Sequence, residues 1–330
     1  MKIMKNPFTG GKAILKYEKS ELTFRKEKFQ YINLFYECED TKERFSTTEI
    51  DEINLSQVYN QYREKYGIPY TDEIKQTRQK YGLPAVKMSK ILGFGENQYR
   101  LYENGDMPSE TSGKVLSSIK NPNTFMGFVE NARRQFASDE HEKVIIKVKN
   151  AINNQNKNLR KDLIFDSYSR GKVNGFAPQS YSKLKNILLF FIERLGSVFN
   201  TKMNKLLFYT DFLSYKNRGI AMSGLAYKAI QFGPVPLKWD RVYSLIDDVD
   251  NRIYEFPSGI SGTKLCSDLS PDLNTFSSDE ISILENVLDH FKDATATDIS
   301  KTSHQEDAWK DYINTDKTID FDEAFSLKIL

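Results

Sequence analysis

The sequence predicts a mainly α-helical protein with a small antiparallel β element at its N-terminus. Two patterns support this fold class. Apolar and polar residues alternate in residues 12–37, as in β-strands, whereas most later segments repeat their apolar residues every three or four positions, as in helices. The chain has 330 residues, of which 39% are hydrophobic and 28% charged, and this composition is typical of a globular protein with two or three domains.

The composition also limits the cellular context. No segment approaches the run of roughly 18 apolar residues that a membrane span needs, and the first residues lack the apolar core of a signal peptide. Cys38 and Cys266 are too few to form a disulfide framework. We therefore expect a cytoplasmic protein without a membrane segment.

Charge is distributed unevenly along the chain. Residues 240–330 contain 20 acidic and 8 basic residues, a net charge of −12. Because the whole chain carries +2, residues 1–239 carry +14. This segregation indicates either two solvated surfaces or two partners, an anionic one for the front of the chain and a basic one for the back.

Residues 1–70 are expected to form the β element and one helix. The alternation in residues 12–37 predicts two or three antiparallel strands. The helix that follows is capped by Thr47 or Thr48 and ends at Gly67.

Residues 71–130 are expected to form a compact run of short helices. Three of them lie in residues 74–106, where Pro84 opens the second helix and a glycine turn at 93–95 precedes the third. Ser89 is the small residue at which these two helices cross. Five residues are expected to form a miniature core: Met88, Leu92, Phe94, Tyr99 and Tyr102.

The faces left outside this core carry polar residues that suit DNA. A short helix, a glycine turn and a polar helix form the helix-turn-helix pattern, whose second helix enters the major groove. Asn and Gln can pair with adenine, Arg with guanine, and Lys can hold phosphates. The alternative, a plain three-helix bundle, leaves the exposed polar residues unexplained. The predicted DNA-binding residues are Lys87, Asn97, Gln98, Arg100 and Lys114.

Residues 81–109 resemble the helix-turn-helix of MqsA-type antitoxins, in which a glycine-rich turn precedes an Asn-bearing recognition helix. In that family an Asn and an Arg contact bases. Asn97 matches the Asn, whereas the Arg position falls on Leu101, with Arg100 one residue earlier. The resemblance implies binding to operator double-stranded DNA, which we expect to be palindromic and bound by a homodimer.

MqsA-type proteins also open with a zinc ribbon built from two Cys-x-x-Cys pairs. The matching positions here are Asn6, Thr9, Cys38 and Thr41, so three of the four thiolates are missing. One cysteine cannot hold a structural zinc, which takes four ligands. The resemblance therefore implies a metal-free ribbon, and we expect neither a metal nor another cofactor.

Residues 131–177 form a lysine-rich polar stretch with one apolar group at 144–148. This composition predicts a linker or a helix with a solvated face.

Residues 178–330 are expected to form a separate domain. It begins with two strongly amphipathic helices, at 181–196 and 200–219, each ending at a glycine. A rigid turn is expected at 233–236, because both prolines of its Gly-Pro-Val-Pro sequence lock φ. Ser278 is placed as the N-cap of a later helix, with acidic residues in its first turn.

This half resembles the Panacea domain, also called SocA-like, which recurs in antitoxins of bacterial toxin–antitoxin pairs. The resemblance rests on a Lys-Leu-Leu-x-Tyr-x-Asp helix, the Gly-Pro-Val-Pro segment and a Ser-His-x-x-x-x-Trp segment. It implies a mostly helical toxin-neutralising domain. Its motif residues, structural or toxin-facing, are Lys205, Tyr209, Asp211, Phe232, Gly233, Pro234, Pro236, His304, Glu306 and Trp309.

An enzymatic function finds little support. His304, Glu306 and Asp211 could suggest acid–base chemistry, but a lone histidine near Trp309 is better explained as a structural group. The sequence has no second ligand at metal spacing, no nucleophile beside a base and no phosphate-binding glycine loop.

The sequence thus predicts a non-enzymatic antitoxin with a role in toxin–antitoxin biology or phage defence. It would neutralise a protein toxin encoded nearby through its C-terminal domain and repress its own operon through the helix-turn-helix. The alternative is a stand-alone transcription regulator whose C-terminal domain senses a ligand or a phage protein.

Overall fold

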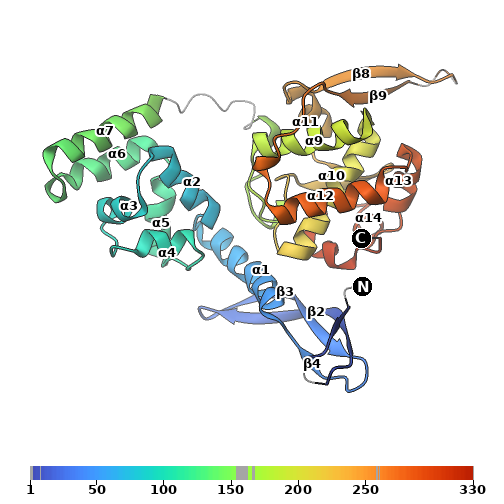
Figure 1. Cartoon of the computed structure of the whole chain (residues 1–330), viewed down its shortest axis with the longest axis horizontal. Helices are drawn as coiled ribbons and strands as arrows, with labels where there is room; N and C mark the ends of the chain where they lie inside the picture. Colours follow the sequence, from blue (N-terminus) through green and yellow to red (C-terminus); the bar gives the residue numbers. More distant parts are fainter. Residues whose placement is uncertain are drawn as a thin grey trace. The chain divides into compact units, whose positions relative to one another are not determined.

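The computed structural model describes residues 3–7, 9–153, 163–165, 168–257, 259 and 261–329 (Figure 1). The chain divides into two compact units, Met1–Val58 with Arg160–Leu330 and Tyr59–Leu159. About 52% of the chain is helical and 17% lies in strands, so the mainly α fold class predicted from the sequence is wrong and the fold is mixed. The prediction failed because the β hairpin is long and because several strands in the C-terminal half are too short to show alternation.

The N-terminal strands of the first unit form one antiparallel sheet in the order β1-β2-β3-β4. Arg25 and Lys26 make the tight turn between β2 and β3, both with positive φ, as a two-residue hairpin turn of the I′ kind requires. Helix α1 follows, and the Thr47 hydroxyl accepts from the Ile50 amide at its start, as predicted. The bounds are β1 Ile3–Lys5, β2 Lys12–Phe24, β3 Glu27–Cys38, β4 Arg44–Phe45 and α1 Thr48–Tyr66.

Two side chains of α1 close the outer edge of β3. The Gln57 amide exchanges hydrogen bonds with the backbone N–H and C=O of Ile32, at 3.0 and 2.9 Å. The Asn54 amide does the same with Leu34, at 2.9 Å in both directions. Both amides are buried, and each satisfies backbone groups that another strand would otherwise pair.

The C-terminal part of the first unit packs helices around α10, with short sheets at its surface. The strands form two sheets, β5-β9-β8 and β6-β7. The helices are α9 Tyr181–Leu195, α10 Asn200–Arg218, α11 Trp239–Leu245, α12 Ser278–Phe291, α13 Ala296–Ser303 and α14 Asp307–Lys310. The strands are β5 Val198–Phe199, β6 Tyr227–Ile230, β7 Gly233–Pro236, β8 Asp250–Glu255 and β9 Ser261–Cys266. Short 3-10 helices are η3 Lys172–Asn174, η4 Leu273–Thr275 and η5 Phe321–Ser326.

Three details of this half differ from the sequence-based expectation. Helix α10 is not amphipathic, because every residue from 203 to 215 is buried. The segment 233–236 is a strand that pairs with β6 rather than a turn; its prolines are tolerated because a two-stranded sheet has only edge strands. The N-cap of α12 is Ser277 rather than Ser278, since the Ser277 hydroxyl accepts from the Glu280 amide at 3.3 Å.

The second unit is helical. Its elements are α2 Thr71–Tyr81, α3 Ala85–Leu92, α4 Gln98–Glu103, α5 Glu110–Ser118, α6 Pro122–Asn131, η1 Arg133–Gln135 and α7 Ser138–Asn153. Helix α7 lies inside the segment predicted to be a linker or a helix with a solvated face, and its Val144 and Val148 belong to the same buried core as Tyr81 and Phe125. The apolar group at 144–148 is therefore one face of a packed helix.

Replacing Val148 by Asp tests the packing of α7. Val148 is fully buried, so an unpaired carboxylate there should lower the free energy of unfolding of this unit by about 3–5 kcal/mol. Ile146→Asp is the matched control, because Ile146 is 52% exposed and should tolerate the change. Urea unfolding followed by circular dichroism measures both. Equal stability of the two variants would contradict the packing of α7.

Candidate functional site

The predicted DNA-binding residues lie around α3 and α4. The five predicted core residues belong to one buried cluster, with Phe94 at its edge. Ser89 is buried where the two helices meet, and its hydroxyl accepts from the Tyr99 amide at 3.0 Å. The Tyr99 hydroxyl donates to the Ile74 carbonyl at 2.8 Å, which fixes α4 against α2.

The predicted DNA-binding residues differ in their exposure to solvent. Asn97 and Arg100 are exposed and Gln98 is half-buried at the start of α4, while Lys114 is exposed on α5. Lys87 is less available to a DNA phosphate, because its amine forms an ion pair with Glu140 of α7 at 2.8 Å. The structure therefore leaves Asn97, Arg100 and Lys114 as the exposed members of the set.

A second polar cluster lies between the loop that joins β1 to β2 and the loop that joins β3 to β4. The four positions Asn6, Thr9, Cys38 and Thr41 meet there, although they come from segments about thirty residues apart. Hydrogen bonds from Thr41, Asn6 and Thr9 lower the pKa of the Cys38 thiol to about 6. The Thr9 hydroxyl lies 3.6 Å from the Cys38 sulfur, close to the edge of about 3.8 Å expected for a tetrahedron of thiolates at 2.3 Å from zinc.

The two turns that carry these residues have the same hydrogen-bond pattern. Gly10 N–H donates to the Asn6 carbonyl at 2.9 Å, and Lys42 N–H donates to the Cys38 carbonyl at 3.1 Å. Gly10 and Lys42 also share a positive φ, of 73° and 58°. The backbone thus forms two loops with matching conformations. Between them, Thr41, Asn6 and Thr9 make hydrogen bonds to the Cys38 sulfur.

Asp211 is the most heavily bonded of the C-terminal motif residues. Its carboxylate is fully buried and accepts hydrogen bonds from the amides of Met222 and Ser223, at 2.8 and 2.6 Å. The hydroxyls of Ser223 and Tyr227 donate to its second oxygen. Burial raises the pKa of Asp211, and these four donors oppose that rise.

Tyr209 and Glu306 form a second buried pair. The Tyr209 hydroxyl donates to the Glu306 carboxylate at 3.3 Å, and the Lys328 amide donates to the same group at 2.9 Å. Burial raises the pKa of Glu306. The pair ties α10 to the start of α14 and to the last residues of the chain.

Lys205 is buried on α10, and its amine makes no hydrogen bond within the described part of the chain. Burial lowers the pKa of Lys205 to about 7. Gly233 lies against this side chain with φ 102°, and a Cβ at that position would be 2.6 Å from the Lys205 Cε and 2.5 Å from the Ser303 hydroxyl. Glycine at 233 is therefore required both by its conformation and by the close approach of the lysine.

His304 and Trp309 hold the β6–β7 hairpin. Their rings stack at 4.0 Å with an interplanar angle of 21°, and the Trp309 indole donates to the Ile230 carbonyl at 2.8 Å. Burial and the charge of Lys205 lower the pKa of His304. At the hairpin tip Phe232 is 62% exposed, whereas Gly233, Pro234 and Pro236 are buried.

An open pocket of about 750 Å³ lies beside Trp309 and the β6–β7 hairpin. Trp309 and Gln231 line one side, and the segment 313–318 lines the other. Of the ten predicted motif residues, Trp309 is the one that reaches this pocket.

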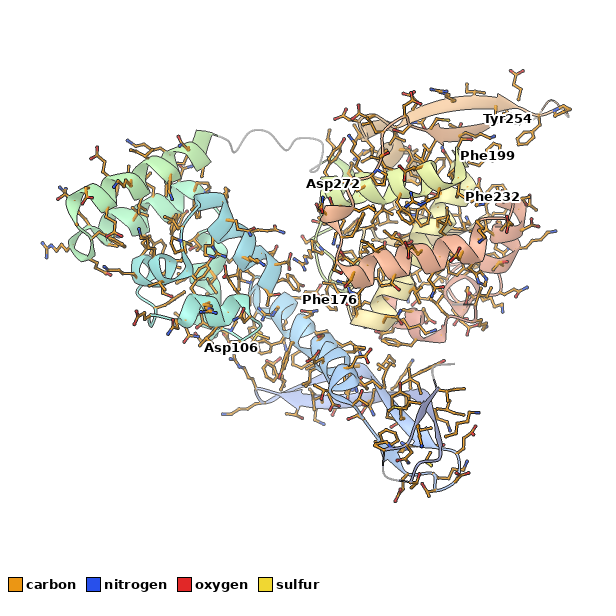
Figure 2. All side chains as sticks on the ribbon, in the orientation of Figure 1. Asp106, Phe176, Phe199, Phe232, Tyr254 and Asp272 are labelled. Carbon is orange, nitrogen blue, oxygen red and sulfur yellow. The ribbon has the colours of Figure 1, made fainter. Side chains whose placement is uncertain are left out.

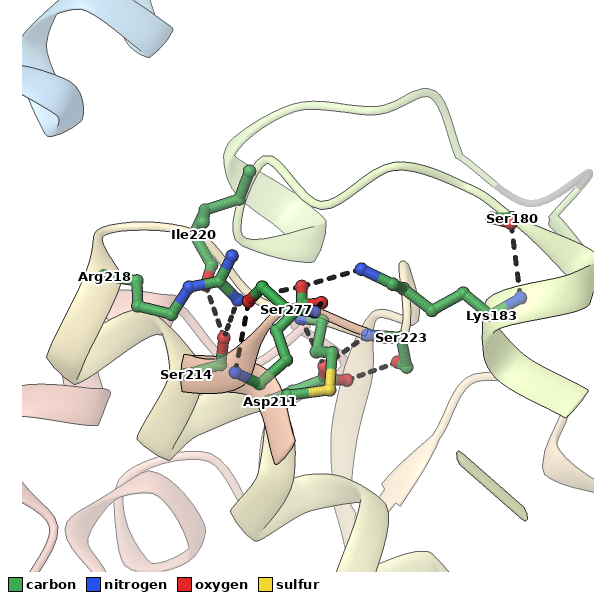
Figure 3. Close-up of polar contacts among 10 residues, drawn as sticks. Ser180, Lys183, Asp211, Ser214, Arg218, Ile220, Ser223 and Ser277 are labelled. Carbon is green, nitrogen blue, oxygen red and sulfur yellow. Dashed lines mark hydrogen bonds and ion pairs between the residues drawn. The ribbon is translucent and has the colours of Figure 1, made fainter. Parts of the chain in front are cut away.

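Sequence reasoning missed one buried ionic network at the start of α12 (Figure 3). The Glu280 carboxylate is 5% exposed and binds Lys183 of α9 at 2.7 Å and Arg218 of α10 at 3.0 Å. Burial opposes its charge, but the two cations outweigh this effect and lower the pKa of Glu280. In the sequence, the Ser-x-x-Glu capping pattern at 277–280 marks Glu280. No local pattern indicates its two partners, Lys183 and Arg218, because they are distant in the sequence.

Two other kinds of site are absent from the described residues. Among the described residues, no three His, Cys, Asp or Glu side chains lie together as a metal site. None of the helices in the described ranges combines the length and apolar composition of a membrane span.

Comparison with known proteins relates part of the C-terminal half to a known family. Residues 203–310 match the family Antitoxin SocA-like, Panacea domain. The match runs from α10 to α14, so the matched segment contains Asp211, the β6–β7 hairpin and the His304–Trp309 stack. No curated protein and no solved structure matches the chain.

Introducing three thiolates tests the polar cluster around Cys38. The full-length Asn6→Cys/Thr9→Cys/Thr41→Cys variant should bind one zinc per chain, because the matching loops already place four positions around one centre. Elemental analysis and the absorption of the cobalt-substituted protein measure binding. The Asn6→Cys/Thr9→Cys variant, with three thiolates, is the control and should bind more weakly. A triple variant that melts as the wild type does and takes up no metal would contradict the geometry.

Replacing the buried amine of Lys205 tests its cost to stability. The folded pKa of about 7 lies below the ordinary value of 10.5, so between these values the unfolded chain binds more protons and stability should rise with pH. Lys205→Met should therefore stabilise the protein by a few kcal/mol near pH 6.5, since one pKa unit corresponds to about 1.4 kcal/mol. The gain should shrink towards pH 10.

Urea unfolding at several pH values measures this difference. The matched control is Lys228→Met, because Lys228 is exposed. A less stable Lys205→Met variant would show that the amine makes a favourable interaction in the folded protein.

Proposed function

We propose that this chain is an antitoxin whose Panacea domain binds and masks a partner protein toxin encoded nearby. The match of residues 203–310 to an antitoxin-like family carries this proposal. The partner is expected to be basic, because residues 240–330 have a net charge of −12 and opposite charges speed association. The mechanism is occlusion of the toxin rather than catalysis.

The buried state of the motif residues supports a division of roles. Lys205, Tyr209, Asp211 and Glu306 are buried and bonded or packed internally, so they support the domain rather than a partner surface. Phe232 is the exposed member, held by the Ser300 hydroxyl, which donates to its carbonyl at 2.7 Å. An exposed aromatic side chain on a fixed hairpin is suited to be an interface anchor.

The second part of the proposal is that α3 and α4 form a helix-turn-helix that binds the operator of the same operon, as the MqsA-type resemblance implies. Exposed Asn97 and Arg100 support it, because their side chains can contact adenine and guanine edges. The net charge of +4 in residues 74–120 favours contact with phosphates. One chain would then both neutralise the toxin and repress its own gene.

One observation favours the alternative of a ligand-sensing regulator, namely the open pocket beside Trp309. Such a regulator would need no toxin partner. Co-expression with the neighbouring gene product therefore separates the two functions.

Two full-length variants should separate neutralisation from repression. Phe232→Asp should lose protection against the neighbouring toxin and keep promoter binding, because it alters only the hairpin tip. Asn97→Ala/Arg100→Ala should protect normally and lose promoter binding, by about 1–3 kcal/mol for each side chain. Growth on co-expression and gel shifts on the promoter measure the two activities.

Leu269→Asp is the control for Phe232→Asp, since Leu269 is 48% exposed and lies outside the hairpin. Failure of the wild-type chain to protect would reject the antitoxin function. Protection by Phe232→Asp equal to that of the control would remove Phe232 from the interface, and normal promoter binding by the double variant would reject α4 as the reader of DNA.

A further inference from the structure

The outer strand of the sheet β5-β9-β8 is unusually open. All six residues of β8 are exposed, and in the described part of the chain β8 pairs only with β9. Ile253 is 77% exposed and Tyr254 43%, and Phe256, which follows the strand, is 39% exposed. Figure 1 shows this hairpin extending from the helices of its unit, and Figure 2 places Tyr254 on it. An edge that combines free backbone groups with large apolar side chains is a template for another strand.

The same unit closes one long strand edge, that of β3. Asn54 and Gln57 bond the outward groups of β3, as described above. On β8, the side-chain bond that reaches the body of the unit is that from Asn251 to the Tyr243 carbonyl, which leaves the strand's backbone uncovered. An uncovered edge that also exposes Ile253 and Tyr254 is suited to pair with another strand.

We propose that β8 pairs in antiparallel orientation with β8 of a second copy of this chain, with Ile253 opposite its own counterpart. The two sheets would then form one continuous six-stranded sheet across a two-fold axis. A two-fold axis maps an antiparallel ladder onto itself only when one residue faces its own copy. This condition leaves a small number of registers to compare.

The residues of β8 favour the register centred on Ile253. That register places Arg252 opposite Tyr254 and Asn251 opposite Glu255, so no like charges meet and the two most exposed apolar side chains are covered. Arg252 keeps its pairing with Asp250 of the same strand, at 3.2 Å. Guanidinium–aromatic and apolar pairs of this kind stabilise neighbouring strands.

The other registers are poorer. Centring on Arg252 would place two guanidinium groups opposite each other, which is destabilising. Centring on Tyr254 would place Ile253 opposite Glu255. Centring on Asn251 would require Val249 to face Ile253, but Val249 is buried.

The face of the sheet that carries Tyr254 would extend the contact. Phe199 and Phe256 stack at 5.5 Å, and Tyr254 meets both rings edge-on at 5.8 and 4.9 Å. The Lys264 amine lies 4.4 Å from the Tyr254 ring centre. This cluster fixes the orientation of Tyr254 before any partner arrives. The dimer is independent of the proposed toxin and DNA functions.

Charge substitutions at Ile253 test both the dimer and its register. The full-length wild type should have twice the monomer mass of 38.2 kDa at high concentration by sedimentation velocity. Ile253→Lys and Ile253→Glu should each weaken dimerisation at least about tenfold, because two like charges would meet on the two-fold axis. An equimolar mixture of the two should dimerise again, since Lys would then face Glu.

The matched controls are Leu269→Lys and Leu269→Glu, which should dimerise like the wild type, and melting curves should show all variants folded. A wild type that stays at 38.2 kDa up to about 100 μM, the weak end of specific pairing, would overturn the proposal. So would a dimer that is insensitive to both Ile253 changes, or one that the mixture does not restore. A monomer whose Ile253→Lys variant no longer neutralises the neighbouring toxin would assign the edge to that toxin instead.

Discussion

The arrangement of the segment that matches the Panacea family depends on the hydrogen bonds to the buried carboxylate of Asp211. A carboxylate inside a helix that is buried on every side is unfavourable unless donors satisfy it. Four donors from the segment 222–227 do so, and they bring that segment to α10. Strand β6 begins in this segment, so the position of the β6–β7 hairpin follows from the bonds to one side chain. The approach of Gly233 to Lys205 and the exposed tip at Phe232 follow in turn.

Local signals explain what the sequence could predict. The helices of the second unit have proline starts, glycine ends and compact apolar spacing, so α2, α3, α4 and their shared core were predictable. The four positions around Cys38 were expected only from the MqsA-type resemblance, which aligns the two turns with each other. In the helices the information lies within a few residues of the feature that it specifies.

Features built from distant residues could not be predicted in the same way. Lys183 and Arg218 meet Glu280 across 97 and 62 positions of the sequence. Helix α10 was interpreted as amphipathic because its polar residues resemble a solvated face, whereas several of them are bonded inside the domain. Strands β5 to β9 contain two to six residues each, too few for alternation to distinguish them from loops.

The amides of Asn54 and Gln57 also decide how the long hairpin is aligned. Successive residues of a strand direct their backbone groups to opposite sides, so only every second residue of β3 presents groups to α1. Sliding the strand by one residue would leave both buried amides without partners, at a cost of about 1–3 kcal/mol for each. Helix α1 therefore favours one position of β3 along the helix. The register of the twelve residue pairs between β2 and β3 is consistent with that position.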